Sequence, residues 1–169
     1  PGVTLKIIDN NGRDLPPNQL GELCISSPSM MLGYWNNPSA TKQAIHGSWI
    51  HSGDLGYLDN EGYFWFIDRR KNIIIVDGDN VAPREVENVL CKHKAVSVAV
   101  VVGKQEYNNS VVCAFVKPHK NNVTDSNTLI EFCKQHLADF KVPKKIIFLD
   151  EMPTNARGKI DRTALINLI

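Results

Sequence analysis

The first 68 residues carry the two-residue alternation of apolar and polar side chains that is typical of half-buried strands. The segments that show this pattern, with turn residues at their ends, are Val3–Asp9, Gly21–Ser26 and two runs within Leu55–Asp68. The two runs surround Asp59-Asn60-Glu61-Gly62, so they predict a hairpin. Asn37 followed by Pro38 predicts a helix that continues to Ile45. We therefore expect a mainly β region with one short helix.

The pattern changes after Arg69-Arg70-Lys71, where strands begin to alternate with helices. Short apolar segments predict strands at Asn72–Val76, Val96–Val102, Val111–Val116 and Lys145–Leu149. Capping residues and three- and four-residue apolar spacing predict helices from Pro83, from Thr124 or Asp125, and over Asp161–Leu168. Their expected inward residues are Val86, Val89, Leu90, Leu129, Ile130, Cys133 and Leu137. This alternation predicts a small α+β domain of about 100 residues.

Three consecutive cations cannot lie in a core, so we place a domain boundary at residues 69–72. The expected domains are residues 1–69 and residues 70–169. The fold class that follows is α+β, with a β-rich first part and a smaller mixed second part.

Composition excludes several classes of protein. Of the 169 residues, 43% are hydrophobic and 22% are charged, which is typical of a folded domain and not of a disordered one. The longest uncharged apolar stretches are under half the length that a membrane span requires. Residues 1–68 hold three basic and seven acidic side chains, and residues 69–169 hold sixteen and eleven. The second half therefore suits an anionic ligand, but its excess is too small for nucleic acid.

The four cysteines form no CxxC pair and no cluster with histidine at metal-ligand spacing. Each lies in an apolar segment, so we expect buried, reduced thiols in a cytoplasmic protein, and no metal site. The chain begins with proline and has no basic-then-apolar leader. These features suggest a piece of a longer protein.

Three segments contain residues that could bind a ligand or take part in a reaction. In His51-Ser52-Gly53-Asp54, a carboxylate after a glycine at a strand end can accept hydrogen bonds from two neighbouring hydroxyls, as on a ribose. The second segment is Phe66–Lys71 together with Gly78–Pro83, which alone fits a basic linker and a turn. In Pro153–Arg162, a glycine beside a lysine lets the backbone approach a ligand that the ammonium reaches. Taken singly, each segment also fits an ordinary turn or a solvated loop.

In this order, the three segments resemble the adenylate-forming superfamily, which includes acyl-CoA synthetases, peptide-synthetase adenylation domains and luciferases. Further family-like features are Gly21-Glu22-Leu23, Gly33-Tyr34-Trp35, Gly62-Tyr63-Phe64 and Glu85-Val86-Glu87. The resemblance covers the whole chain. It implies that residues 1–69 end a large N-terminal domain and that residues 70–169 form a small, mobile C-terminal domain. Such enzymes convert a carboxylic acid and ATP into acyl-AMP, pass the acyl group to a thiol, and rotate the small domain between the two steps.

The resemblance also implies roles for individual residues. Asp54 matches the acid that holds the ribose hydroxyls, Arg69 a second ribose or phosphate contact, and Phe66 an apolar contact to the nucleotide. Lys71 matches the hinge. Lys159 matches the lysine whose cation offsets negative charge during adenylation. Mg²⁺ would arrive with ATP, so no residue of this chain is expected to hold a metal.

The acyl acceptor depends on the segment considered. Gly78 and Asp79 lie in the loop that approaches the pantetheine arm of CoA in this family, where a side chain at Gly78 would obstruct the thiol. The family often has Lys-Gly-aromatic-Gln or Gly-Gly-Glu-Asn where this chain has Asp77-Gly78-Asp79-Asn80. Gly158–Arg162 resembles adenylation domains of peptide synthetases, whereas Asp68–Lys71 and Val81-Ala82-Pro83 resemble acyl- or aryl-CoA ligases.

We therefore expect part of a cytoplasmic acyl-CoA synthetase that uses ATP, CoA and a fatty or aryl acid. The alternative is an enzyme that loads a carrier protein. A non-catalytic module is a third hypothesis, against which the joint presence of Asp54, Arg69 and Lys159 argues. A phosphate-binding loop and an acyl pocket are absent from the sequence, so we expect them in a preceding domain and expect this chain alone to be inactive.

Overall fold

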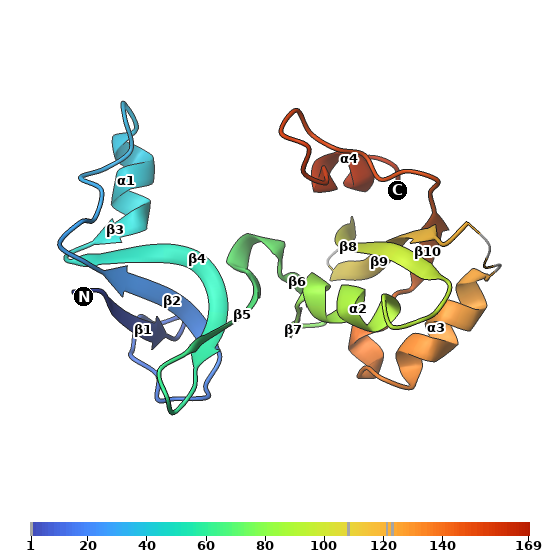
Figure 1. Cartoon of the computed structure of the whole chain (residues 1–169), viewed down its shortest axis with the longest axis horizontal. Coiled ribbons are helices and arrows are strands. Elements are labelled where there is room, and N and C mark those ends of the chain that lie inside the picture. The colour runs from blue at the N-terminus through green and yellow to red at the C-terminus, as the bar shows by residue number, and fades with distance from the viewer. Residues whose placement is uncertain (1, 108, 121, 123) are drawn as a thin grey trace. The chain divides into compact units, whose positions relative to one another are not determined.

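The computed structural model describes residues 2–107, 109–120, 122 and 124–169. The chain divides into two compact units, Pro1–Lys71 and Asn72–Ile169, which we call unit 1 and unit 2 (Figure 1). A 3₁₀ turn, η1 (Arg70–Asn72), lies at this boundary. Two statements remain predictions, namely that unit 1 is the end of a larger domain and that unit 2 is mobile.

Unit 1 is built around an antiparallel sheet. Its strands are β1 (Thr4–Ile8), β2 (Gly21–Ser26), β3 (Ile45–His46), β4 (Trp49–Leu58) and β5 (Phe64–Arg69). The order is β1-β2-β4-β3, and β5 pairs with β4. Helix α1 (Pro38–Ala44) connects β2 to β3. The buried apolar residues of unit 1 include Ile7, Ile8, Leu23 and Cys24, which lie on β1 and β2.

Local signals account for most of unit 1. The Asn37 side chain accepts a hydrogen bond from the N–H of Ala40, and Pro38 begins α1, as predicted. The predicted hairpin is confirmed as β4 and β5. Strand β4 is longer than expected because it begins at Trp49 and contains a bulge where the sequence suggested a strand end. The two-residue β3 is too short to show a pattern.

Unit 2 contains two sheets. The larger sheet has the order β10-β9-β8, in which β8 (Val96–Glu106) and β9 (Asn109–Pro118) are antiparallel and β10 (Lys145–Phe148) is parallel to β9. Strands β6 (Ile74–Val76) and β7 (Asp79–Val81) form a small hairpin. The helices are α2 (Pro83–Leu90), α3 (Ser126–Lys134) and α4 (Arg162–Ile166), with a 3₁₀ turn, η2 (Asp139–Lys141).

The core of unit 2 lies on both faces of the larger sheet. Successive side chains of a strand point to opposite faces, so β8 and β9 supply two clusters. One cluster joins them to α2 and α3 and contains Val86, Val89, Leu90, Val101, Val112, Ala114, Leu129 and Cys133. The other joins them to α4 and contains Val100, Val102, Cys113, Phe115 and Leu165. Both faces are covered, which explains why these strands are continuous valine-rich runs (Figure 1).

The α+β class predicted from the sequence is confirmed, and three details are corrected. Strand β7 was expected only as the end of a turn. Leu137 lies beyond the end of α3, although it still packs against the core. Cys91 is exposed because it follows the last turn of α2, while the other three cysteines are buried. Among the described residues, no helix is long and apolar enough to cross a membrane.

Candidate functional site

Asp54 lies in a bulge of β4, where three residues of β4 face one residue of β2. Gly53 has a φ of +71°, which lets the backbone turn without ending the strand. The Ser52 hydroxyl donates to the carbonyl of Leu23 (2.7 Å) and accepts from the N–H of Asp54 (3.0 Å). The expectation that Asp54 lies at a strand end is therefore wrong, because these contacts keep the strand continuous on both sides.

Asp54 and Arg69 face each other across β4 and β5. The Arg69 Nε lies 2.6 Å from the Asp54 Oδ1, and the two side chains are 53% and 23% exposed. The direction of this approach is not that of a hydrogen bond. Within the described part of the chain, this buried oxygen has no hydrogen-bond donor. The Asp54 side chain as a whole is 23% exposed, so its carboxylate can accept a hydrogen bond from a ligand hydroxyl beside the Arg69 cation.

Glu22 is a buried acid that holds this bulge in place. Its Oε1 accepts from the N–H of Gly53 (3.1 Å), and its Oε2 lies 2.8 Å from the Nη1 of Arg70 and 3.4 Å from the Nδ1 of His51. Glu22 is 6% exposed, so its charge would be costly without such partners. The bulge and the start of η1 are thereby held at one point of the sheet.

The remaining candidates of unit 1 lie on or just after β5. Phe66 faces Gly56 across the hairpin and is 40% exposed. Lys71 is the middle residue of η1 and is exposed. Its ammonium has no hydrogen bond or ion pair among the described residues. The structure thus brings Asp54 and Arg69 into contact and places Phe66 in the same hairpin, with Lys71 beyond its end.

Gly78 and Asp79 belong to the turn between β6 and β7. Asp77 and Gly78 have φ values of +51° and +92°. The Asp77 N–H donates to the Asn109 Oδ1 (2.9 Å), and the Asn109 Nδ2 donates to the Asp77 Oδ1 (2.6 Å). A Cβ on Gly78 would meet nothing within 4 Å. Within this chain the backbone conformation, rather than packing, therefore favours glycine.

Lys159 lies in a tight turn before α4. The Asn155 N–H donates to the carbonyl of Lys159 (2.8 Å), and the Gly158 N–H donates to the carbonyl of Asn155 (2.9 Å). The Asn155 Oδ1 accepts from the N–H groups of Arg157 (2.9 Å) and Lys159 (3.2 Å). Lys159 is exposed, and its ammonium has no hydrogen bond or ion pair in the described structure. The turn therefore holds the lysine backbone and leaves its charge available.

Arg162, the first residue of α4, attaches this turn to the larger sheet. Its guanidinium donates to the carbonyl of Val101 and lies 2.8 Å from the Glu87 Oε1, which also accepts from the N–H of Val101 (2.9 Å). Val101 belongs to β8, which lies at the edge of the sheet and offers unpaired backbone groups there. Leu165 is fully buried and fixes α4 on the sheet face. We call the ion pair of Glu87 with Arg162 the Glu87–Arg162 clamp.

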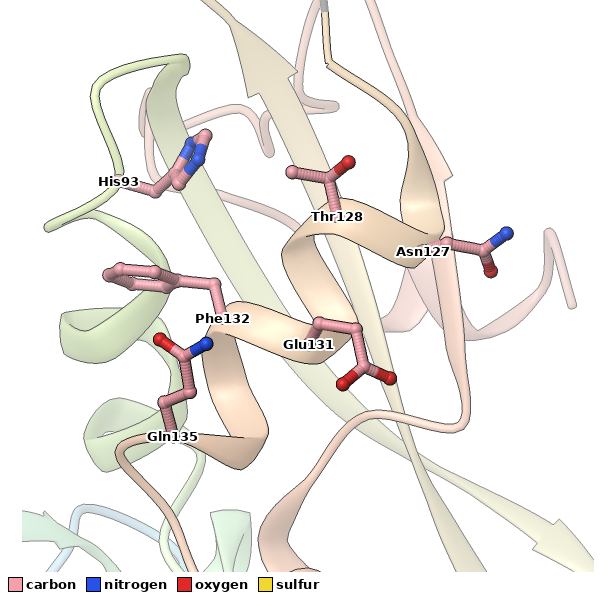
Figure 2. Close-up of a pocket in the computed structure, with 6 residues that line it drawn as sticks. All are labelled: His93, Asn127, Thr128, Glu131, Phe132 and Gln135. Carbon is pink, nitrogen blue, oxygen red and sulfur yellow. The ribbon is translucent and has the colours of Figure 1, made fainter.

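The surface pockets of unit 2 include two that we compare with these contacts. One lies between α3 and the turn after α2; its lining residues are His93, Asn127, Thr128, Glu131, Phe132 and Gln135 (Figure 2). There the Phe132 and His93 rings meet edge to face at 5.1 Å. The other pocket lies against the turn of Gly78, and its lining includes Asp77, Lys134 and Lys144. The first holds none of the predicted site residues, while the second adjoins the turn expected to approach CoA.

The buried thiols are poorly suited to act as nucleophiles. Burial raises the pKa of the Cys24 thiol and of the Cys133 thiol to about 11. Burial also raises the pKa of Cys113 above its ordinary value. The thiolate is the reactive form, so these three residues are mainly protonated at neutral pH. Among the described residues, no three His, Cys, Asp or Glu side chains are grouped to hold a metal ion.

Sequence reasoning gave no role to four residues that the structure links to the site, namely Glu22, Glu87, Asn155 and Arg162. A charged residue between apolar positions of a strand was an available signal for Glu22. An asparagine three residues before a glycine was a signal for a turn cap at Asn155. Glu87 and Arg162 are 75 residues apart, so no local pattern pairs them.

Comparison with known proteins gives matches along most of the chain. The model of the AMP-binding enzyme C-terminal domain matches residues 85–159, and the AMP-binding enzyme model matches residues 1–35. A fatty acid–[acyl-carrier-protein] ligase, ScoC, of Streptomyces coeruleorubidus is 43% identical over 98% of this chain and 32% of its own length. A 2-succinylbenzoate–CoA ligase of a Geobacillus strain is 42% identical over 96% and 33%.

Solved structures give a similar result. The o-succinylbenzoate coenzyme A synthetase of Bacillus subtilis, in complex with ATP and magnesium ion, is 38% identical to this chain. Its TM-score is 0.86 over 97% of this chain and 34% of that structure. This chain therefore spans about a third of the length of the relatives described.

Proposed function

Because the chain belongs to the adenylate-forming superfamily of AMP-binding enzymes, we propose that the protein is an ATP-dependent acid–thiol ligase. It activates a carboxylic acid as acyl-AMP and transfers the acyl group to the thiol of CoA. The observation that carries this proposal is the pair of Asp54 and Arg69, which face each other across β4 and β5 with Nε and Oδ1 2.6 Å apart and with both side chains partly exposed. We assign the remaining two thirds of the enzyme, including the acyl pocket and the phosphate-binding loop, to a preceding domain.

In the nucleotide site, Asp54 accepts hydrogen bonds from the ribose hydroxyls of ATP. Arg69 lies beside this carboxylate and contacts ribose or phosphate oxygens. Phe66 is partly exposed, as a contact surface for the nucleotide requires. Mg²⁺ enters with ATP as part of the substrate, which fits the ATP and magnesium ion in the related synthetase.

During adenylation, an oxygen of the substrate carboxylate attacks the α-phosphorus of ATP and pyrophosphate leaves. Negative charge concentrates on the oxygens around that phosphorus. Lys159 brings its ammonium, which has no ion pair among the described residues, to these oxygens and stabilises the transition state. An ammonium already held by a carboxylate of its own chain would first have to give up that partner.

During thioester formation, the thiol loses its proton, its sulfur attacks the acyl carbonyl, and AMP leaves. We propose that unit 2 rotates about Lys71 between the two steps, so that the turn of Gly78 and Asp79 replaces Lys159 near the adenylate. The absence of a partner for the Lys71 side chain in the described structure is compatible with a pivot. Gly78 adds no side chain in the path of the thiol.

A carrier protein is the second candidate acceptor. It is favoured by ScoC, which is a fatty acid–[acyl-carrier-protein] ligase by name and is as similar to this chain as the CoA ligase is. The features Asp68–Lys71 and Val81-Ala82-Pro83 favour CoA. Among acids, we propose a fatty or aryl acid, in keeping with the names of these relatives. We further propose that the enzyme acts in the cytoplasm, where ATP and CoA are available.

Acid-dependent exchange of pyrophosphate into ATP by the full-length enzyme tests the first step. We expect exchange with at least one fatty or aryl acid, followed by thioester formation with CoA. Transfer to a phosphopantetheinylated carrier protein, with no transfer to CoA, would favour the second candidate. Absence of exchange with every acid of both classes would contradict the proposal. The 169-residue chain alone should show no exchange, because it lacks the groups that position the acid.

A further inference from the structure

Three turns of the chain share one backbone design, beginning at Asp9, Asp59 and Asn155. In each, the N–H of the fourth residue donates to the carbonyl of the first, at 3.1, 3.1 and 2.9 Å. The N–H of the first residue donates to the carbonyl of the fifth, at 2.9, 3.0 and 2.8 Å. The fourth residue is glycine each time, with φ values of +79°, +85° and +72°. The turn that carries Lys159 is therefore a standard form in this protein.

The side chain of the first residue completes each turn in the same way. Its Oδ1 accepts from the N–H groups of the third and fifth residues. The two distances are 2.8 and 2.8 Å at Asp9, 3.0 and 2.9 Å at Asp59, and 2.9 and 3.2 Å at Asn155. The acceptor is a carboxylate at Asp9 and Asp59 and an amide at Asn155. The backbone thus requires an oxygen acceptor at this position and does not require a charge.

The turn at Asp9 shows what a carboxylate would do beside a cation. Its fifth residue is Arg13, as Lys159 is the fifth residue of the third turn. The backbone N–H of Arg13 is the largest factor holding the pKa of Asp9 below its ordinary value, and the charge of the Arg13 guanidinium contributes in the same direction. An aspartate at position 155 would place the same negative charge at the same distance along the turn from the Lys159 ammonium.

We propose that Asn155 is a positioning residue for adenylation. Its amide oxygen fixes the turn that presents Lys159, and its lack of charge leaves the ammonium free for the anionic substrates. This inference rests on the proposed role of Lys159 and deepens it. A carboxylate at this position would both attract the ammonium and repel the approaching acid and phosphate groups.

The test is Asn155→Asp in the full-length enzyme, with Asp59→Asn as the matched reverse exchange in a turn that has no expected role in the reaction. We expect Asn155→Asp to slow adenylation about 10-fold, because exclusion of water from a closed site strengthens charge interactions. The loss should shrink at high ionic strength. Thioester formation from supplied acyl-AMP should be unchanged, and Asp59→Asn should leave both steps unchanged.

Asn155→Ala separates charge from turn geometry, since it removes the acceptor without adding a charge. Its loss of adenylation should not respond to salt. Adenylation by Asn155→Asp at the wild-type rate would overturn the inference. Equal, salt-independent losses in Asn155→Asp and Asn155→Ala would also overturn it, because they would reduce Asn155 to a turn cap.

A readout without catalysis distinguishes this inference from the proposed function. The rate at which an N-hydroxysuccinimide ester acylates Lys159 should fall about twofold in Asn155→Asp, while amide NMR shifts show that the turn is retained. If that rate falls and even the wild-type enzyme fails to adenylate any acid, the proposed function is wrong and the effect of the amide on the lysine stands. An unchanged rate would contradict the electrostatic effect itself.

Discussion

The acid of unit 1 and the lysine of unit 2 are presented in opposite ways. Asp54 lies inside a strand, half-buried, with the Arg69 Nε 2.6 Å away. Beside it lies the buried Glu22, which pairs with Arg70. Lys159 lies on an exposed turn and has no ion pair among the described residues. The acid is thus held by its side chain, and the lysine is held by its backbone alone.

The difference fits two kinds of task. A group that holds the ribose is useful in every step in which the nucleotide is bound, so a fixed and charge-balanced position suits it. A cation that is needed in one step must reach its substrate and then withdraw. Pairing within its own domain would weaken it at the moment of reaction, since a salt bridge must first be broken. We infer that unit 1 supplies constant binding and unit 2 supplies chemistry for a single step.

The largest effect on nucleotide binding is expected at Asp54. Asp54→Ala in the full-length enzyme should weaken ATP binding by about 1.5–3 kcal/mol, the usual range for a hydrogen bond to a charged group. The loss should be much smaller with 2′,3′-dideoxy-ATP, which has no hydroxyls to bind. Titration calorimetry with both nucleotides measures the difference. Equal losses for the two nucleotides would mean that Asp54 does not contact the ribose.

A smaller effect is expected from the Glu87–Arg162 clamp, which holds the lysine turn from outside the site. Arg162→Met should slow adenylation about 10-fold, because small displacements of a catalytic group are costly. Thioester formation from supplied acyl-AMP should change little. Glu85 lies on α2, as Glu87 does, and forms an ion pair with Lys141 in which Nζ and Oε2 are 2.8 Å apart. This pair provides a matched control. Lys141→Met should leave both steps near the wild-type rate.

Glu87→Gln tests whether a loss of folding stability alone explains slower adenylation in Arg162→Met. The amide retains the acceptor for the Val101 N–H but loses the charge that faces Arg162. We expect a loss between wild type and Arg162→Met, with a thermal midpoint close to wild type. Equal losses in both half-reactions for all clamp variants would show that the clamp stabilises unit 2 without positioning the lysine.

Some features of the fold and of the site follow from the local sequence, and others do not. Caps such as Asn37, the hairpin turn at Asp59 and the apolar face of α2 depend on neighbouring residues, so local rules found them. The bulge at Gly53 and the exposure of Cys91 depend on how strands pair and where a helix ends. The proposed roles of Asp54 and Lys159 came from resemblance, because a lone acid or a lone lysine has no distinguishing pattern.

The hinge offers a third test, with a modest expected effect. Lys71→Pro should restrict the backbone at Lys71 and before it, and so hinder rotation. We expect the two half-reactions to differ in their loss by about fivefold, or ~1 kcal/mol, because each requires a different pose of unit 2. Lys71→Ala removes the charge alone and serves as the control. Small and equal losses in Lys71→Pro would place the pivot at another residue.

The smallest effect concerns the stability of unit 1 rather than its site. The Trp65 indole N–H donates to the Asp59 Oδ2 (2.7 Å), and this bond is the main cause that keeps the pKa of Asp59 below its ordinary value of 3.8. The stabilisation is therefore complete above pH 3.8 and is lost as pH falls through the lower folded-state pKa. Thermal midpoints measured from pH 5 to pH 2 should fall slightly more for wild type than for Asp59→Asn. Parallel curves would contradict this linkage.

The most direct test of the division of labour is to measure both half-reactions on Lys159→Ala in the full-length enzyme. We predict that adenylation, measured by pyrophosphate exchange, slows about 10²–10³-fold, the usual scale for one preorganised electrostatic contact. Thioester formation from synthetic acyl-AMP should stay within about threefold of wild type, or ~0.7 kcal/mol. A parallel loss in both half-reactions would contradict the account, because Lys159 would then support the fold or the domain arrangement. No loss in either would show that the lysine is an ordinary solvated residue of its turn.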